Sequence, residues 1–280
     1  MAAGRAPPGI GGPQRDVGLG MTTVTAERQE FAIAILGGPT TVIDIGGRRL
    51  VVDPTFDPPG EQGYLTKLTG PAVSDAELGP VDAVLVSHED HPDNLDTSGR
   101  AFALAAPILV AGPTHAGRLG PAAIPLAPWQ TTQVGAVTVQ AVPAEHGPAD
   151  GDRDADGNIN TEVIGFVLSG NGIPTVYVSG DNASIRVVTE IAERVGQVDV
   201  AVLFAGAASV PIKERGRPLT LTSHRAAAAA AVLNAPVVIP SHYTGWAHFS
   251  EPATNIPAAF DEAGLAGVLK MAPLGEWTTP

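Results

Sequence analysis

The feature of this sequence that most limits its fold is a set of short apolar strands that run directly into histidine or aspartate. Residues 81–87 (VDAVLVS) form a nearly continuous apolar run, which is typical of a strand buried on both faces. The polar segment 88–96 (HEDHPDNLD) follows at once. Similar runs precede His146, Asp181 and His242. Polar side chains at the ends of buried strands indicate a functional site.

The rest of the chain predicts a strand meander followed by strands that alternate with helices. Residues 31–52 contain short β-type runs separated by GGP and GG, a pattern of hairpins. Later apolar runs alternate with helical stretches, one of them capped by Thr222 or Ser223. Helices are expected at residues 97–105, 184–195, 222–233 and 256–263. Because there is neither an internal linker nor a repeat, we expect one domain over residues 23–280.

Residues 1–22 are rich in glycine, proline and alanine. They lack the continuous apolar centre of about 7–15 residues that a secretory signal needs. We therefore expect a flexible N-terminal arm, and either Met1 or Met21 can be the start. No apolar run approaches the roughly 20 residues that span a bilayer, so we expect no membrane partner and a cytoplasmic location.

The overall charge and the absence of cysteine narrow the function classes. The formal net charge is −13 at pH 7, so the field of the molecule repels phosphate backbones. A small-molecule substrate is expected rather than nucleic acid, and the oligomeric state is left open. Without cysteine, any metal must be held by histidine and carboxylate ligands.

Four strand-end segments supply such ligands. Imidazole and carboxylate groups suit Zn²⁺, which is favoured here, and also Mn²⁺ or Fe²⁺, with positions left open for water. This is the outline of a hydrolytic site. The candidates are His88, Asp90, His91, Asp93, Asn94, His146, Asp181 and His242.

On these segments the sequence resembles the metallo-β-lactamase superfamily, in particular its branch similar to ascorbate-6-phosphate lactonase. The match runs from about residue 31 to 275 and includes GGPTTVIDIGGRRLVVDPTF, VLVSHEDHPDNLD, PAEHGP, YVSGD and VVIPSHYTGWAHFSE. The resemblance implies an α/β fold, an αββα four-layer sandwich with mixed sheets. It also implies one or two metal ions held by an HxHxDH motif and by a later His, Asp and His, which match His146, Asp181 and His242.

The first motif departs from the family pattern. Read without a gap, it places Asp90 at the second histidine and Asp93 at the last. One extra residue gives HxxHxDN instead, in which His88, His91 and Asp93 keep their types and Asn94 replaces the last histidine. We prefer this register. The resemblance then implies a first metal site of His88, His91 and His146, a second of Asp93, Asn94 and His242, and a bridging Asp181.

Asn94 offers an amide oxygen where the family has imidazole, so the second site is expected to bind its ion less tightly. Asp90 and His248 are the spare candidates for that position. A metal-activated water would attack a lactone, ester, amide or phosphate ester. Asp93 would orient the water and move its proton, unless it only caps the following helix. His248 would donate a proton from the pocket wall, unless it is structural.

Two other function classes remain open at this point. One is an iron-dependent redox enzyme, and the other is a binding protein that keeps the fold without turnover. Residues 151–162 (GDRDADGNINTE) resemble the start of a calcium-binding loop, but the twelfth position is Val163, so we expect a solvated acidic loop.

The remaining histidines, His115 and His224, lie in or at the start of expected helices and are predicted to be surface or capping residues. The basic group at residues 213–217 is predicted to be a solvated loop, with attraction of an anionic substrate as the alternative. Aromatic residues could line a substrate pocket or pack in the core; they are Trp129, Tyr243, Trp246 and Phe249.

Overall fold

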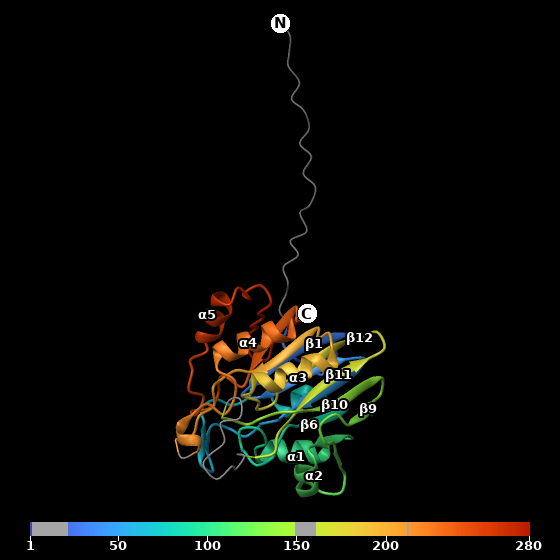
Figure 1. Cartoon of the computed structure of the whole chain (residues 1–280). Coiled ribbons are helices and arrows are strands. Elements are labelled where there is room, and N and C mark those ends of the chain that lie inside the picture. Colours follow the sequence, from blue (N-terminus) through green and yellow to red (C-terminus); the bar gives the residue numbers. More distant parts are fainter. Residues whose placement is uncertain (2–21, 149–160, 212) are drawn as a thin grey trace.

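In the computed structural model, the described residues 1, 22–148, 161–211 and 213–280 form two six-stranded sheets and a small hairpin (Figure 1). The first sheet has the order β1 (Phe31–Gly37), β2 (Thr40–Ile45), β3 (Arg48–Val52), β6 (Ala83–Val86), β7 (Leu109–Ala111) and β8 (Ala123–Pro125). The second has the order β14 (Val237–Ser241), β13 (Val200–Phe204), β12 (Ile173–Val178), β11 (Ile164–Gly170), β10 (Val137–Pro143) and β9 (Thr131–Val134). The hairpin consists of β4 (Gly60–Gln62) and β5 (Leu65–Lys67).

Both sheets are mixed, and each changes from antiparallel to parallel pairing part-way across. In the first sheet β1, β2 and β3 pair antiparallel, and β3, β6, β7 and β8 pair parallel. In the second sheet β9 to β12 pair antiparallel, and β12, β13 and β14 pair parallel. Strands β10, β12, β13 and β14 therefore run in one direction. Tight turns at residues 46–47, 135–136 and 171–172 lie at the starts of β3, β10 and β12.

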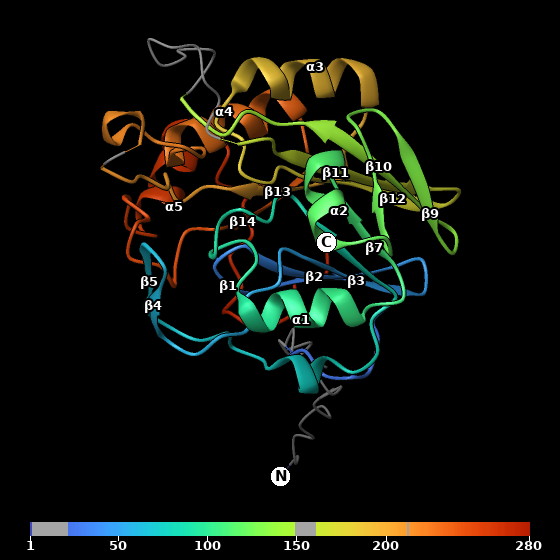
Figure 2. The same ribbon diagram turned by 90° about the horizontal axis from the view of Figure 1, so that it is seen from below.

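The two sheets pack face to face, and helices cover their outer faces. Inner-face side chains such as Ile43 and Leu85 from the first sheet meet Phe166 and Val202 from the second in one core. The outer faces pack against α1 (Thr97–Ala105), α2 (Pro113–Leu119), α3 (Ile185–Val195), α4 (Ser223–Leu233) and α5 (Asn255–Glu262). Figure 2 shows α3 and α4 on one side of the sheets and α1 on the other. The predicted αββα sandwich is confirmed.

The four helices whose bounds were predicted, α1, α3, α4 and α5, begin and end within one residue of those bounds, and α2 had no predicted bounds. The Thr222 side chain accepts a hydrogen bond from the Arg225 backbone N–H, which confirms the expected cap of α4. Four alanines of α4 lie in the core, where small side chains allow close packing; they are Ala226, Ala227, Ala229 and Ala230. No helix among the described residues is long and apolar enough to cross a membrane.

Two predictions lie wholly or mainly outside the described residues. The expected N-terminal arm over residues 1–22 is described only at its ends, and most of the calcium-loop-like segment is not described. The division into an arm and one domain over residues 23–280 stays a prediction.

Arg49 on β3 ties the start of the described chain to the first sheet. Its side chain is fully buried, and its guanidinium donates to both carboxylate oxygens of Asp44 at 2.7 Å. It also donates to the carbonyls of Thr25 at 2.6 Å, Glu27 at 2.9 Å and Leu78. One cation thus satisfies several buried acceptors, which would otherwise be costly to desolvate.

We expect Arg49→Met to lower the free energy of unfolding by about 3–5 kcal/mol, because it leaves the Asp44 carboxylate buried without its partner. Urea denaturation measures this change. Arg48→Met, the neighbouring control, removes a side chain that is 44% exposed and pairs with Asp82, and should cost less than about 1 kcal/mol. Equal effects of the two substitutions would contradict this account of Arg49.

Candidate metal centre

The first cluster joins three histidines and an aspartate from three strand ends. His88 and His91 follow β6, His146 follows β10 and Asp181 follows β12. The Nδ1 atom of His91 lies 2.8 Å from Nε2 of His88 and 3.1 Å from Nε2 of His146. Oδ2 of Asp181 lies 3.5 Å from Nε2 of His146. All four side chains are buried, and their ligand atoms lie within 4.8 Å of one another.

The second cluster contains Asp93, His242 and His248. Oδ2 of Asp93 lies 3.1 Å from Nε2 of His242 and 2.9 Å from Nε2 of His248. The structure therefore brings together the predicted residues of each site under the register HxxHxD, and it adds His248 to the second group. His248 comes from the turn-rich segment after β14, six residues beyond His242.

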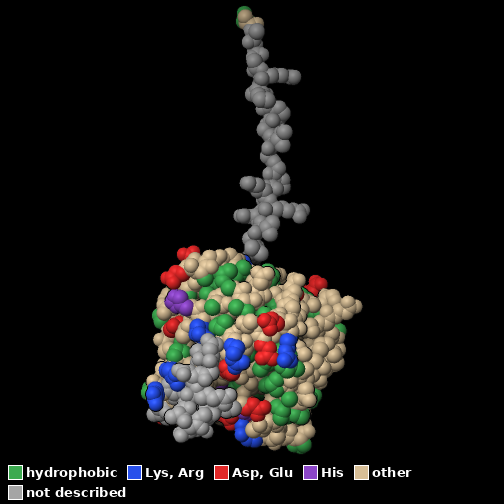
Figure 3. Space-filling view, viewed as in Figure 1, with side chains coloured by type: hydrophobic (Ala, Val, Ile, Leu, Met, Phe, Trp, Pro, Cys, Tyr) green, Lys and Arg blue, Asp and Glu red, His purple; other side chains and the backbone are tan. Residues whose placement is uncertain are grey.

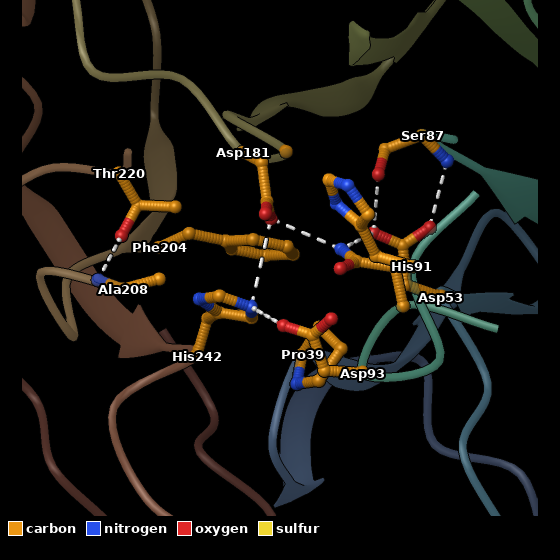
Figure 4. A network of polar contacts seen from close by, with 12 residues as sticks. Pro39, Asp53, Ser87, His91, Asp93, Asp181, Phe204, Ala208, Thr220 and His242 are labelled. Atoms are coloured by element: carbon orange, nitrogen blue, oxygen red, sulfur yellow. Dashed lines mark hydrogen bonds and ion pairs between the residues drawn. The ribbon is translucent and has the colours of Figure 1, made fainter. Parts of the chain in front are cut away.

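Asp181 lies between the two clusters. Its Oδ2 faces His146, while its Oδ1 lies 3.6 Å from Nε2 of His242. Figure 4 shows Asp181 directed toward His242, which in turn faces Asp93. Asn94 donates from its amide nitrogen to Oδ1 of Asp181 at 3.0 Å. Asn94 thus orients Asp181 through its amide nitrogen, while its amide oxygen, the predicted ligand atom, is buried without a hydrogen-bond partner among the described residues.

Asp53, directly after β3, was missed by the sequence reasoning. Its carboxylate is fully buried and accepts from Ser87 N at 2.7 Å, Ser87 Oγ at 2.6 Å and Asn94 Nδ2 at 3.2 Å. Ser87 Oγ also lies 3.0 Å from Nδ1 of His88. Asp53 thus supports His88 through Ser87, as outer carboxylates support metal-ligating histidines. The sequence pattern could have predicted Asp53, because it directly follows the apolar strand β3, as the other site residues follow theirs.

The backbone is strained where it presents these groups. Asp53 and His242 have positive φ angles of 44° and 57°, which are uncommon outside glycine. A Cβ on Gly206 would lie 2.1 Å from the carbonyl oxygen of His242, so the segment after β13 approaches His242 as only glycine allows. The ring of His242 also stacks on Phe204 with centroids 5.2 Å apart. Strained residues of this kind concentrate at functional sites.

Burial sets the protonation of the first cluster. It lowers the pKa of His88 and His146 well below the usual range and that of His91 to about 4, and the mutual repulsion of the imidazoles adds to this for His88 and His146. Burial also raises the pKa of Asp181 to about 6, although His242 opposes the rise. The three imidazoles are therefore neutral at pH 7 and can offer lone pairs.

The second cluster behaves as an ion pair. Burial alone would raise the pKa of Asp93, but His248 and His242 outweigh it and hold that pKa well below its usual range. Burial alone would lower the pKa of His242, but Asp181 and Asp93 raise it. The carboxylate charge of Asp93 is thus stabilised by its two histidines.

The donor atoms fit one or two divalent transition-metal ions. Nε2 of His88, Nδ1 of His91 and Nε2 of His146 lie too close together for hydrogen bonds among themselves to satisfy all three. Lone pairs that converge in this way suit a cation. Asp93 Oδ1 is buried and has no hydrogen-bond partner among the described residues, which is the kind of unsatisfied group that an ion or water explains. A metal cofactor is therefore supported, while its identity is not defined by the donor set.

A third group, Glu89, Asp90 and His115, is an ion-pair network. Glu89 pairs with Arg100 and Arg118, and Asp90 accepts from Arg118 at 2.6 Å. Asp90, a spare ligand candidate, therefore lies outside both clusters. The predicted surface position of His115 is wrong, because its side chain is 1% exposed beneath this network. His224 is exposed as predicted and pairs with Glu262.

A small pocket with room for about one water molecule lies over both clusters. His91, Asp93, His146, Asp181 and His248 line its floor. Its walls are Tyr64, Leu65, Ala208, Val210, Lys213 and Leu219. The predicted solvated position is wrong for Lys213, whose Nζ lies 3.0 Å from Nε2 of His91.

The aromatic residues named from the sequence are not on the walls of this pocket. Trp246 is 2% exposed and packs in the interior, and the Phe249 ring packs on His242 and His248 with centroids 4.4 Å and 4.7 Å away. Trp129 lies under the guanidinium of Arg194. These rings support the site or the core, so the core-packing alternative holds.

Comparison with known proteins agrees with this geometry. A family model described as "Beta-lactamase superfamily domain" matches residues 48–243, which is more than half of the chain. The chain belongs to the metallo-β-lactamase superfamily. A curated relative, a UPF0173 metal-dependent hydrolase of Anaeromyxobacter dehalogenans, is 27% identical over 207 residues, covering 71% of this chain and 69% of the relative. The predicted class, a metallo-hydrolase of this superfamily, is confirmed.

Solved structures show the same fold at low identity. An isothiocyanate hydrolase from Delia radicum gut bacteria has a TM-score of 0.76 at 17% identity, covering 89% of this chain and 98% of that one. CmlA, a diiron β-hydroxylase from Streptomyces venezuelae, has a TM-score of 0.63 at 17% identity, covering 89% of this chain and 54% of that one. At these identities the likeness extends to the fold alone.

We expect His146→Ala to abolish metal binding at the first cluster, because it removes one of three converging imidazoles. Elemental analysis of protein purified without chelators measures the loss. The gain in melting temperature that metal gives the wild type should also disappear, since bound metal adds to the free energy of folding. His224→Ala is the surface control and should change neither. Full metal occupancy in His146→Ala would refute the assignment of this cluster.

Proposed function

We propose that the protein hydrolyses a lactone, ester, amide or phosphate ester bond of a small molecule at a metal centre built from the two clusters. The observation that carries the proposal is the position of Asp181. Its two oxygens face different clusters, and it lies on the floor of the pocket. In this position Asp181 would help to hold an ion at either cluster.

The chemistry of the centre divides between the ions and the chain. Bound divalent ions supply a water of lowered pKa and polarise the substrate oxygen. Asp93 is the residue best placed to orient the attacking water and take its proton. Its Oδ2 is held by His242 and His248, and its buried Oδ1 has no hydrogen-bond partner among the described residues. General-base help of this kind contributes about 10²–10⁴-fold.

His248 is better supported as a ligand of the second site than as a proton donor. It shares the Asp93 oxygen with His242 and belongs to the same cluster. It therefore supplies the imidazole that Asn94 lacks, and Asn94 keeps Asp181 in place by its hydrogen bond. Nitrogen-rich sets such as these favour Zn²⁺, and Mn²⁺ or Fe²⁺ are the alternatives.

The pocket and the surface support a small, non-polymeric substrate. The pocket is small and is lined by residues of both clusters and by apolar side chains. On the face drawn in Figure 3, Lys and Arg side chains lie beside Asp and Glu rather than in a continuous basic patch. With a net charge of −13, this surface argues against binding of a nucleic-acid backbone.

We expect the metal-loaded protein to hydrolyse at least one of four probe classes: lactones, 4-nitrophenyl esters, anilides and 4-nitrophenyl phosphates. Activity should fall to background with EDTA and return on adding Zn²⁺, Mn²⁺ or Fe²⁺, because the water is activated only by a bound ion. His146→Ala provides the baseline. Loaded protein that hydrolyses none of these would count against the proposal. Iron content with substrate-dependent oxygen uptake would favour a redox enzyme.

We expect His248→Gln to lower metal content by about one ion per chain and kcat by roughly 10²-fold or more. The wild type should already load both sites, so Asn94→His should not raise the metal content. His224→Gln controls for the loss of a histidine far from the site. Unchanged metal content with a lowered kcat would return His248 to the proton-donor role, and no change in either would place it outside the reaction.

A further inference from the structure

Lys213 is the cationic side chain among the described residues that line the pocket. It lies between β13 and α4. Its ammonium lies 5.4 Å from the centroid of the Tyr64 ring, which holds it by a cation–π contact, and 3.0 Å from Nε2 of His91. The walls beside it are apolar, namely Leu65, Val210 and Leu219. A half-buried ammonium between apolar walls indicates that Lys213 binds a ligand in the pocket.

The two nitrogens of His91 face different partners. Nδ1 meets His88 and His146 in the first cluster, and Nε2 meets Lys213. An imidazole that offers its Nδ1 lone pair to a cation keeps its hydrogen on Nε2. That atom can then no longer accept from the ammonium. In the protein that carries a metal, the N–H of Lys213 that points at His91 can therefore donate to an acceptor in the pocket that Lys213 lines.

We propose that Lys213 binds an anionic oxygen group of the substrate, a carboxylate or a phosphate, and thereby selects negatively charged small molecules. This proposal rests on the proposed hydrolase function. The substrate places its anion on Lys213, next to His91, and its scissile bond over Asp181 and Asp93 on the pocket floor. Lysine suits this role as a compact point charge that accepts either carboxylate or phosphate.

Hydrolysis of a matched pair of esters tests the selection. Mono-(4-nitrophenyl) succinate carries a free carboxylate, and its methyl ester does not. Lys213→Met should lower kcat/KM for the anionic ester about 10–100-fold, the loss expected for a hydrogen bond to a charged group. The neutral ester should change less than about twofold. Lys213→Arg should retain part of the preference. Arg215→Met, an exposed residue of the same loop, should change neither ester.

Binding of anions that cannot be hydrolysed tests the anion site independently of the hydrolase function. Isothermal titration calorimetry of metal-loaded protein with succinate, inorganic phosphate and neutral succinamide measures anion affinity directly. We expect tighter binding of succinate or phosphate than of succinamide, and which anion binds tighter identifies the group. Lys213→Met should weaken anion binding about 10–100-fold, with metal content unchanged by elemental analysis.

The outcomes are distinct. Lys213-dependent anion binding without hydrolysis of either ester would support the anion site and count against the hydrolase. Equal losses on both esters with unchanged succinate and phosphate binding would make Lys213 a residue that positions His91, and would overturn the proposal. A wild type that binds neither anion more tightly than succinamide would also overturn it.

Discussion

The burial of three carboxylates at one edge of the sandwich is the constraint on which the rest of this structure depends. Asp53, Asp93 and Asp181 are at most 3% exposed, and a buried carboxylate needs positive charge or hydrogen-bond donors nearby. Asp53 takes donors from Ser87 and Asn94, and Asp93 is held by two histidines. Burial nevertheless raises the pKa of Asp53 to about 7 and that of Asp181, which lies between the two clusters, to about 6. A cation between the clusters resolves that cost.

Strand positions and most site residues could be predicted from the sequence, because both follow from local pattern. Apolar runs that end in His or Asp place those side chains at strand ends, and strands of one direction end at one edge of a sheet. The contact of Lys213 with His91 has no local signal, and the sequence offered His248 only as a spare candidate for the second site. Both depend on loops that meet only after the sheets have packed. His115 was misplaced because its helix gave no sign that a polar network would cover it.

The extra residue between His88 and His91 shows how a departure from a family motif is accommodated. The added length is taken up by Glu89 and Asp90, which Arg100 and Arg118 hold against α1 and α2. With that segment anchored, His91 turns its Nδ1 toward His88 and His146. In the proposed centre, His248, which lies beside Asp93, supplies the imidazole that the motif lacks at position 94.

All chemistry-bearing strand ends lie at one edge of the sandwich, and this divides the molecule into two ends with different tolerance to change. The turns at residues 46–47, 135–136 and 171–172 start the strands that lead toward the site. A Cβ at Gly47 or Gly172 would meet no atom within 4 Å. Loops of this kind accept insertions readily. An affinity handle or a reporter peptide therefore belongs at this distal end, where added length leaves the spacing of the catalytic groups unaltered.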